Sequence, residues 1–152
     1  MATLSAGDAA PGFSLQDQSG RKVTLRSLRG RHALVYFYPK ADTPGCTKQA
    51  CGLRDIAAQV GDTAIVGISP DPPSRQARFD EKYGLGFPLL SDQDHAVAEA
   101  FGVWGERSMY GRTYMGIVRS AFLIDEKGRV TRAWYKISPA DTPRRLLEAL
   151  AA

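Results

Sequence analysis

The chain has 152 residues, of which 43% are hydrophobic and 24% charged, and Lys and Arg outnumber Asp and Glu by 20 to 16. This composition excludes a disordered chain and supports one well-filled core, so we expect a single domain over residues 1–152. Two cysteines are too few for a disulfide scaffold. A zinc site with four Cys or His ligands would need both cysteines and both histidines of the chain. We therefore expect no metal.

The predicted elements alternate along the chain. Continuous apolar runs predict two buried strands, over 33–38 and 63–69. Between them, from about 43 to 60, apolar residues recur at helical spacing, which predicts a strand–helix–strand unit. The other predicted elements are strands near 13–15, 23–25, 87–91, 120–124 and 129–135, and helices at 73–83, 94–101 and 139–150. This order predicts the α/β class, with a mixed central sheet that is parallel in the middle.

The N-terminal segment 1–13 has no basic region followed by an apolar run, so it does not resemble a secretory signal. No apolar stretch approaches the roughly 20 residues that cross a bilayer. We expect a soluble cytoplasmic protein without a membrane partner, in which thiols are kept reduced.

The positive charge is concentrated between residues 21 and 40, where no acidic residue occurs. The basic residues of this stripe are Arg21, Lys22, Arg26, Arg29, Arg31 and Lys40. Such a stripe could attract phosphate groups, but no nucleic-acid motif accompanies it, which favours an ordinary solvated surface. We expect no nucleic-acid partner; folding assistance or nucleic-acid protection is the non-enzymatic alternative.

Cys46 follows the first buried strand and falls in the first turn of the predicted helix. Ligands of open α/β sheets bind at the carboxyl ends of the strands, and the amide groups of a first helical turn favour a thiolate. A free cysteine is also among the most buried residue types, so Cys46 could be a small core residue. Position alone leaves both interpretations open.

Cys51 lies five residues after Cys46. On one helix this spacing gives about 7.5 Å of rise and roughly 140° of rotation, so the Cα atoms lie about 8–9 Å apart. That exceeds the ~7 Å limit for a disulfide, which makes a static bridge improbable. A bridge could form after oxidation of Cys46 to sulfenic acid if the helix unwinds locally, and Gly52 would ease unwinding.

Three further residues could complete a site around Cys46. The hydroxyl of Thr43 can lie beside the thiolate, and Pro39 can cover it without offering a competing donor. Arg119 precedes the predicted strand 120–124, so a neighbouring strand could bring its guanidinium to the pocket. The alternative for Arg119 is an exposed cation at a strand end, which the sequence alone favours.

These residues resemble the peroxiredoxins. Pro39-x3-Thr43-x2-Cys46 matches their active-site pattern, and the segment 45–51 resembles the bacterioferritin comigratory protein, or peroxiredoxin Q, branch. The segment 109–125 is similar to the same branch and carries its active-site arginine at Arg119, and residues 7–13 look like its N-terminal signature. The resemblance spans nearly the whole chain.

The resemblance implies a thioredoxin-like fold and an antioxidant thiol peroxidase that reduces hydrogen peroxide and organic hydroperoxides without a metal or organic cofactor. Cys46 would attack the peroxide and become a sulfenic acid, and Cys51 would resolve it as an intramolecular disulfide. Thioredoxin or a glutaredoxin-like protein would then reduce that disulfide. Because both cysteines lie on one predicted helix, a monomer is sufficient for this chemistry.

The resemblance also implies roles for the surrounding residues. Thr43 and Arg119 would orient the peroxide and stabilise negative charge, Pro39 would shield the thiolate, and the amide groups near Gly45 would add to that stabilisation. Gln49 stands where we associate glutamate with this branch. A neutral amide cannot pair as a full charge with an arginine, so we expect Gln49 to affect both the tuning of Arg119 and the readiness of the helix to unwind.

A second enzymatic hypothesis is a protein disulfide oxidoreductase on the same fold. Enzymes of that class use C-x-x-C pairs, whose sulfur atoms are already within bonding distance. The C-x4-C spacing of Cys46 and Cys51 disfavours this hypothesis.

Overall fold

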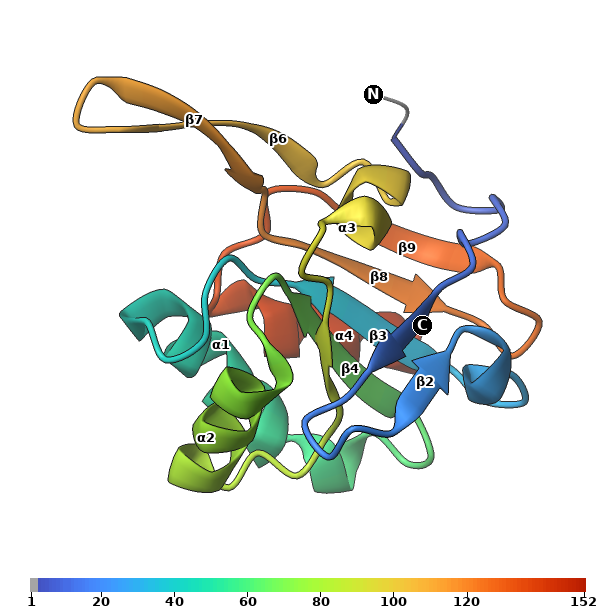
Figure 1. The fold of residues 1–152 in the computed structure, drawn as a ribbon. Coiled ribbons are helices and arrows are strands. Elements are labelled where there is room, and N and C mark those ends of the chain that lie inside the picture. Colours follow the sequence, from blue (N-terminus) through green and yellow to red (C-terminus); the bar gives the residue numbers. More distant parts are fainter. Residues whose placement is uncertain (1–2) are drawn as a thin grey trace.

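The computed structural model describes residues 3–152, and its centre is a seven-stranded sheet in the order β2-β1-β5-β4-β3-β8-β9 (Figure 1). The strands of this sheet are β1 (Ser14–Gln16), β2 (Lys22–Thr24), β3 (Ala33–Phe37), β4 (Ala64–Ser69), β5 (Leu89–Ser91), β8 (Ser120–Ile124) and β9 (Val130–Trp134). Strands β3, β4 and β5 are parallel, whereas β8 pairs antiparallel with both β3 and β9. The predicted mixed sheet with a parallel middle is confirmed.

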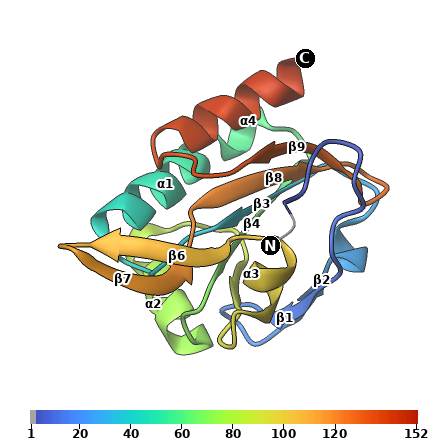
Figure 2. The ribbon, with the colours of Figure 1, turned by 90° about the horizontal axis from the view of Figure 1, so that it is seen from above.

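Helices cover both faces of the sheet (Figures 1 and 2). The helical segments are α1 (Pro44–Asp55), α2 (Pro73–Tyr83), α3 (Ala96–Ala100) and α4 (Asp141–Ala151), with short 3-10 helices η1 (Arg26–Leu28) and η2 (Ala57–Gln59). Buried side chains of α1, α2 and α4 pack in one core, and those of α3 pack in a second core on the other face. Within residues 3–152, no helix combines the length and the apolar character needed to span a membrane.

The sequence of strand β3 is apolar throughout, and does not alternate, because the strand is buried on both faces of the sheet. Successive side chains of a strand point to opposite faces, and both faces of this sheet are covered. Val35 and Phe37 therefore belong to the core beside α3, and Leu34 and Tyr36 belong to the core beside α1. All five residues of the strand are buried.

The helix predicted from 43 to 60 ends earlier than its sequence pattern does. Helix α1 stops at Asp55, and the chain tightens into η2 through a bond from the amide of Gln59 to the carbonyl of Ile56 (2.8 Å). Val60 still reaches the core, at 6% exposure, while Ala57 is exposed. The apolar spacing continued because Val60 is buried, although the α-helix does not extend that far.

The predictions missed a second, two-stranded sheet. Strands β6 (Trp104–Met109) and β7 (Arg112–Ile117) form an antiparallel hairpin that projects from the main body (Figures 1 and 2). Its turn residues Tyr110 and Gly111 both have positive φ, at 51° and 76°, as a two-residue type I′ turn requires. The hairpin lacks an alternating apolar pattern because most of its residues are exposed or only partly buried.

The basic stripe is a solvated surface divided between two ends of the molecule. All six side chains are exposed. Arg31 precedes β3 and Lys40 follows it, so the length of that buried strand separates them. Lys40 alone among the six lines the cavity described below.

Candidate active site

Cys46 lies at the carboxyl end of β3, in the first turn of α1, as the sequence predicted. Its side chain is 1% exposed. The first α-helical bond runs from the amide of Thr47 to the carbonyl of Thr43 (2.8 Å), so the amides of Gly45 and Cys46 precede the bonded part of the helix. This end of a helix carries partial positive charge, which stabilises negative charge on a nearby sulfur.

Arg119 is brought to this thiol by strand pairing. In the antiparallel pair of β3 and β8, Phe37 is opposite Ser120, which places the preceding Arg119 at the carboxyl end of β3. Its Nη2 lies 3.5 Å from the Sγ of Cys46. The guanidinium therefore contacts the thiol, and Arg119 is not the exposed strand-end cation that the sequence alone favoured.

Gln49 holds Arg119 from the other side. Arg119 Nη1 donates to Gln49 Oε1 at 2.7 Å, and Gln49 Nε2 donates to Thr142 Oγ1 at 2.9 Å. The hydroxyl of Thr142 in turn donates to the carbonyl of Ser138 at 2.9 Å. Because the Thr142 proton is already used, its oxygen needs a donor, which an amide supplies and a carboxylate does not. Gln49 thus links α1, Arg119 and α4.

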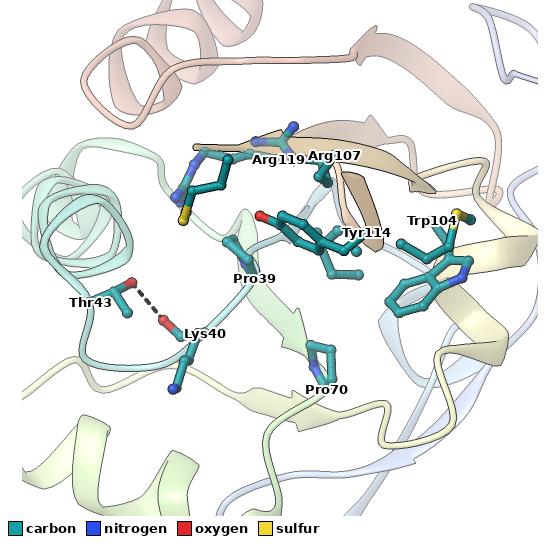
Figure 3. A pocket seen from close by; sticks show the side chains of 12 residues that line it. Pro39, Lys40, Thr43, Pro70, Trp104, Arg107, Tyr114 and Arg119 are labelled. Atoms are coloured by element: carbon teal, nitrogen blue, oxygen red, sulfur yellow. Dashed lines mark hydrogen bonds between the residues drawn. The ribbon is translucent and has the colours of Figure 1, made fainter. Parts of the chain in front are cut away.

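Thr43 and Pro39 lie in the loop that joins β3 to α1, and both line the cavity beside Arg119. The Thr43 hydroxyl donates to the carbonyl of Lys40 at 2.8 Å, which leaves its oxygen lone pairs as acceptors (Figure 3). Pro39 is exposed and has no amide hydrogen. The structure therefore brings Pro39, Thr43 and Arg119 to one cavity, with the Cys46 sulfur in contact with Arg119.

This cavity has a volume of about 580 Å³ and lies between two walls (Figure 3). The loop 39–43 and Pro70 form one wall, and the β6–β7 hairpin forms the other. The hairpin residues that line it are Trp104, Arg107, Met109, Tyr114, Met115, Gly116 and Ile117. Sequence reasoning missed all of them; the Tyr110-Gly111 turn was the signal that could have indicated the hairpin.

Cys51 lies on the same helix as Cys46, and both cysteines are free. Its side chain is partly buried and packs against the core that contains Cys46. Gly52 has a packing role that the sequence did not indicate, because a Cβ atom there would lie 2.8 Å from Pro143 Cγ on α4. Close contact between α1 and α4 thus holds the helix in place around Cys51.

Tyr36 lies on the same face of β3, in the core that contains both cysteines. Its hydroxyl is buried and has no hydrogen-bond partner among residues 3–152. Burial raises the pKa of Tyr36 well above its ordinary value, so the side chain stays neutral beneath α1. Within residues 3–152, no group of three or more His, Cys, Asp and Glu side chains is arranged to hold a metal ion.

The chain is similar to known proteins along most of its length. The model of the AhpC/TSA family matches residues 6–133. Peroxiredoxin Bcp of Escherichia coli is 55% identical over 132 residues (86% of this chain, 85% of that protein), and its Bacillus subtilis namesake is 41% identical over 150 residues (97% and 96%). A structure of the bacterioferritin comigratory protein of Xanthomonas campestris superposes with a TM-score of 0.85 at 36% identity, covering 91% of this chain and 90% of that one.

Proposed function

The chain belongs to the AhpC/TSA family and is a peroxiredoxin of the Bcp and peroxiredoxin Q group, and we propose that it reduces hydroperoxides through Cys46 and Cys51. The observation that carries this proposal is the contact between the Arg119 guanidinium and the Cys46 sulfur, at 3.5 Å, beside a cavity open to substrate. Fixed positive charge beside a buried sulfur is what nucleophilic attack on a peroxide requires.

In the first step, the thiolate of Cys46 attacks one peroxide oxygen. The S–O bond forms as the O–O bond breaks, and the two electrons that leave sulfur reduce the departing oxygen, which takes up a proton as an alcohol or water. The Arg119 guanidinium and the amides of Gly45 and Cys46 stabilise the negative charge that moves along this line. Thr43 accepts the hydrogen bond of the protonated peroxide oxygen, and Pro39 keeps water from the sulfur.

In the second step, Cys51 resolves the sulfenic acid on Cys46. The Cys51 thiol gives up its proton and its sulfur attacks Sγ of Cys46; the S–S bond forms as the S–O bond breaks, and the departing hydroxide takes up a proton and leaves as water. The five-residue spacing on α1 holds the two cysteines apart, so the helix must unwind locally first. Unwinding breaks the Gln49–Thr142 hydrogen bond and the Gly52–Pro143 contact, so these two contacts raise the free energy that is needed to unwind α1.

The cavity favours organic hydroperoxides as well as hydrogen peroxide. Its volume of about 580 Å³ far exceeds that of hydrogen peroxide, and its hairpin wall offers the apolar side chains of Met109, Tyr114 and Met115. The Xanthomonas campestris relative is described as active in alkyl peroxide reduction. We extend that substrate class to this chain.

The catalytic cycle closes when a dithiol protein such as thioredoxin reduces the Cys46–Cys51 disulfide. Both cysteines belong to one chain, so a monomer completes the reaction. A reducing cytoplasm would supply the reductant, in keeping with the localisation expected from the sequence.

The test couples peroxide reduction to NADPH oxidation through thioredoxin and thioredoxin reductase. Cys46→Ser is expected to abolish turnover, whereas Cys51→Ser is expected to consume one equivalent of peroxide and then stop. Mass spectrometry of the peroxide-treated protein without reductant should show the loss of two hydrogens and a Cys46–Cys51 linkage within one chain. Full turnover by Cys46→Ser would refute the proposal.

A further inference from the structure

The loop 38–43 carries two of the residues assigned to peroxide reduction, yet its own conformation is unfavourable. Pro39, Lys40 and Asp42 are exposed, so apolar burial holds the loop only at Tyr38 and Ala41. Asp42 has a φ of 61°, in the left-handed region that side chains other than glycine rarely adopt. Bonds from outside the loop must therefore define its shape.

The buried bond of this loop goes to Asp71. The amide of Ala41, a residue only 4% exposed, donates to Asp71 Oδ2 at 2.7 Å. Asp71 follows β4, which lies parallel to β3, so both strands end at the same edge of the sheet. Its carboxylate is buried, with 8% of the residue exposed. The hydrogen bond from an amide to a buried carboxylate is short and charge-assisted.

A chain of buried side chains holds the Asp71 carboxylate in turn. The Ser69 hydroxyl donates to Asp71 Oδ2 at 2.7 Å and accepts from Gln76 Nε2 at 2.8 Å. Gln76 Oε1 accepts from the Tyr38 hydroxyl at 2.5 Å. Burial raises the pKa of Tyr38, so this hydroxyl keeps its proton and donates. In each of these three hydrogen bonds the donor lies on the Tyr38 side and the acceptor on the Asp71 side, and this fixes the orientation of the carboxylate.

The ion pair of this carboxylate lies on the side that faces solvent. Among residues 3–152, the Asp71 carboxylate makes its one ion pair with Arg75, whose Nε lies 3.8 Å from Oδ1. The arginine side chain is 49% exposed, so this pair is screened by water. Oδ2, which carries the bonds to Ala41 and Ser69, thus does the orienting, and an amide oxygen in its place could accept the same two bonds.

We propose that Asp71 is a positioning residue for peroxide reduction, whose carboxylate fixes the Ala41 amide and thereby the placement of Pro39 and Thr43 around Cys46. The inference rests on the proposed role of Cys46 as the peroxide-reactive thiol. Asp71 touches neither the sulfur nor the cavity; it acts through the backbone of the loop. Displacement of a positioned group by about 1 Å can lower a rate by up to about 100-fold.

The experiment compares two reactions of the Cys46 thiol in a Cys51→Ser background. Stopped-flow fluorescence gives the rate constant for hydrogen peroxide, which depends on Thr43 and Pro39, and iodoacetamide alkylation gives the rate constant for an electrophile that does not. For Asp71→Ala we expect about a tenfold loss with peroxide and an alkylation rate that is unchanged or higher. Asp71→Asn should restore the peroxide rate to within about threefold of the parent.

The matched control is Asp92→Ala. Asp92 is also a buried carboxylate, 2% exposed, that accepts amide hydrogens, but from Val97 and Ala98 of α3. It should lower thermal stability without changing the ratio of the two rates. Ser69→Ala, which removes a donor to Asp71 but keeps the carboxylate, serves if Asp71→Ala does not fold, and should lower the peroxide rate alone.

The outcomes separate this inference from the proposed function. If Cys46 of the parent reacts with peroxide no faster than a free cysteine does, the proposed function fails. If the parent reacts fast but Asp71→Ala and Ser69→Ala keep its ratio of rates, or if Asp71→Asn gives no rescue, the positioning role is overturned. A parallel loss of both rates would also overturn it, because that indicates a general structural defect.

Discussion

The two walls of the cavity beside Cys46 are built in different ways. The wall formed by the loop 39–43 and Pro70, together with the adjoining helix α1, is held by hydrogen bonds that involve Arg119, Gln49 and Asp71, most of them buried. The opposite wall is the β6–β7 hairpin, a separate two-stranded sheet. It carries the large apolar side chains that are most exposed, Met109, Tyr110, Tyr114 and Met115. One wall is fixed from many sides, and the other is bonded mainly to itself.

From this difference we expect each wall to have a separate task in the proposed reaction. Stabilising a transition state requires donors that are already in place, because a misplaced donor loses most of its effect. Contact with the organic part of a substrate is less demanding, since apolar surfaces attract without a fixed geometry. We therefore expect changes on the bonded wall to lower the reaction with every peroxide, and changes on the hairpin to alter only the preference among peroxides.

The largest effect is expected from Arg119→Met, which removes the cation from the sulfur while keeping an unbranched side chain. Loss of one such donor lowers rates by about 100- to 1000-fold. The loss should be equal for hydrogen peroxide and for a bulky organic hydroperoxide, measured as the second-order rate of Cys46 oxidation.

Lysine at this position provides the control for charge. Arg119→Lys keeps a positive charge but loses the fork that contacts both Cys46 and Gln49. It should recover only part of the rate. A selective loss for one peroxide alone would contradict the division of tasks between the walls.

A pair of glycine substitutions compares the walls directly. A Cβ atom at Gly45 would lie 3.2 Å from Arg119 Nη2, and one at Gly116 would lie 3.2 Å from Tyr114 Cε2. The guanidinium is held by its bond to Gln49, so we expect Gly45→Ala to lower the hydrogen peroxide rate about tenfold, equivalent to about 1.4 kcal/mol.

Gly116→Ala meets the same clearance on the hairpin. Because the neighbouring residue Tyr114 is 45% exposed and its side chain can move, the hydrogen peroxide rate should stay within about twofold of wild type. The melting temperature shows whether a loss of rate in Gly45→Ala comes from displacement of Arg119 or from destabilisation of the fold. Alanine is favoured over glycine inside a helix, so Gly45→Ala should not lower Tm. Equal losses of rate in the two variants would count against the comparison.

A smaller, selective effect is expected from Met115→Ser on the hairpin. Removing an apolar contact weakens binding of the organic group by about 1 kcal/mol, which raises KM for a bulky hydroperoxide about fivefold and leaves kcat unchanged. Steady-state kinetics with cumene hydroperoxide and hydrogen peroxide measure the two cases. Tyr110→Ser, at a residue that is 98% exposed and does not line the cavity, is the control and should change neither.

The smallest effect is expected for Asp42, an exposed residue of the loop 39–43. Hydrogen bonds from Lys82 and Tyr83 lower the pKa of Asp42 below its ordinary value of 3.8. A carboxylate of this kind stabilises the fold above pH 3.8 and loses that contribution as the pH falls through its folded-state pKa. Asp42→Asn should therefore lower Tm slightly at neutral pH, and the difference from wild type should shrink toward pH 3. A difference that grew in acid would show that another group carries the effect.

The central elements could be predicted from the sequence because they are buried on both faces. The runs over 33–38 and 63–69 are apolar throughout, and the helix between them has helical apolar spacing, so local patterns are enough to identify them. The β6–β7 hairpin gives no such pattern, because exposed strands need not alternate. Its one signal, the turn at Tyr110-Gly111, lacks the Asn-Gly or Asp-Gly pair that marks most turns of this type.

The spacing of Cys46 and Cys51 and the motif around them were determined by the sequence alone, because both cysteines, Thr43 and Pro39 lie within 13 consecutive residues. Geometry along one strand, loop and helix follows from local rules. The contacts of Arg119 and Asp71 were decided only by the tertiary structure. Arg119 is 73 residues from Cys46, and Asp71 is 30 residues from Ala41. Only the pairing of β8 and β4 with β3 brings those groups to one edge of the sheet, and strand pairing depends on contacts that no local pattern specifies.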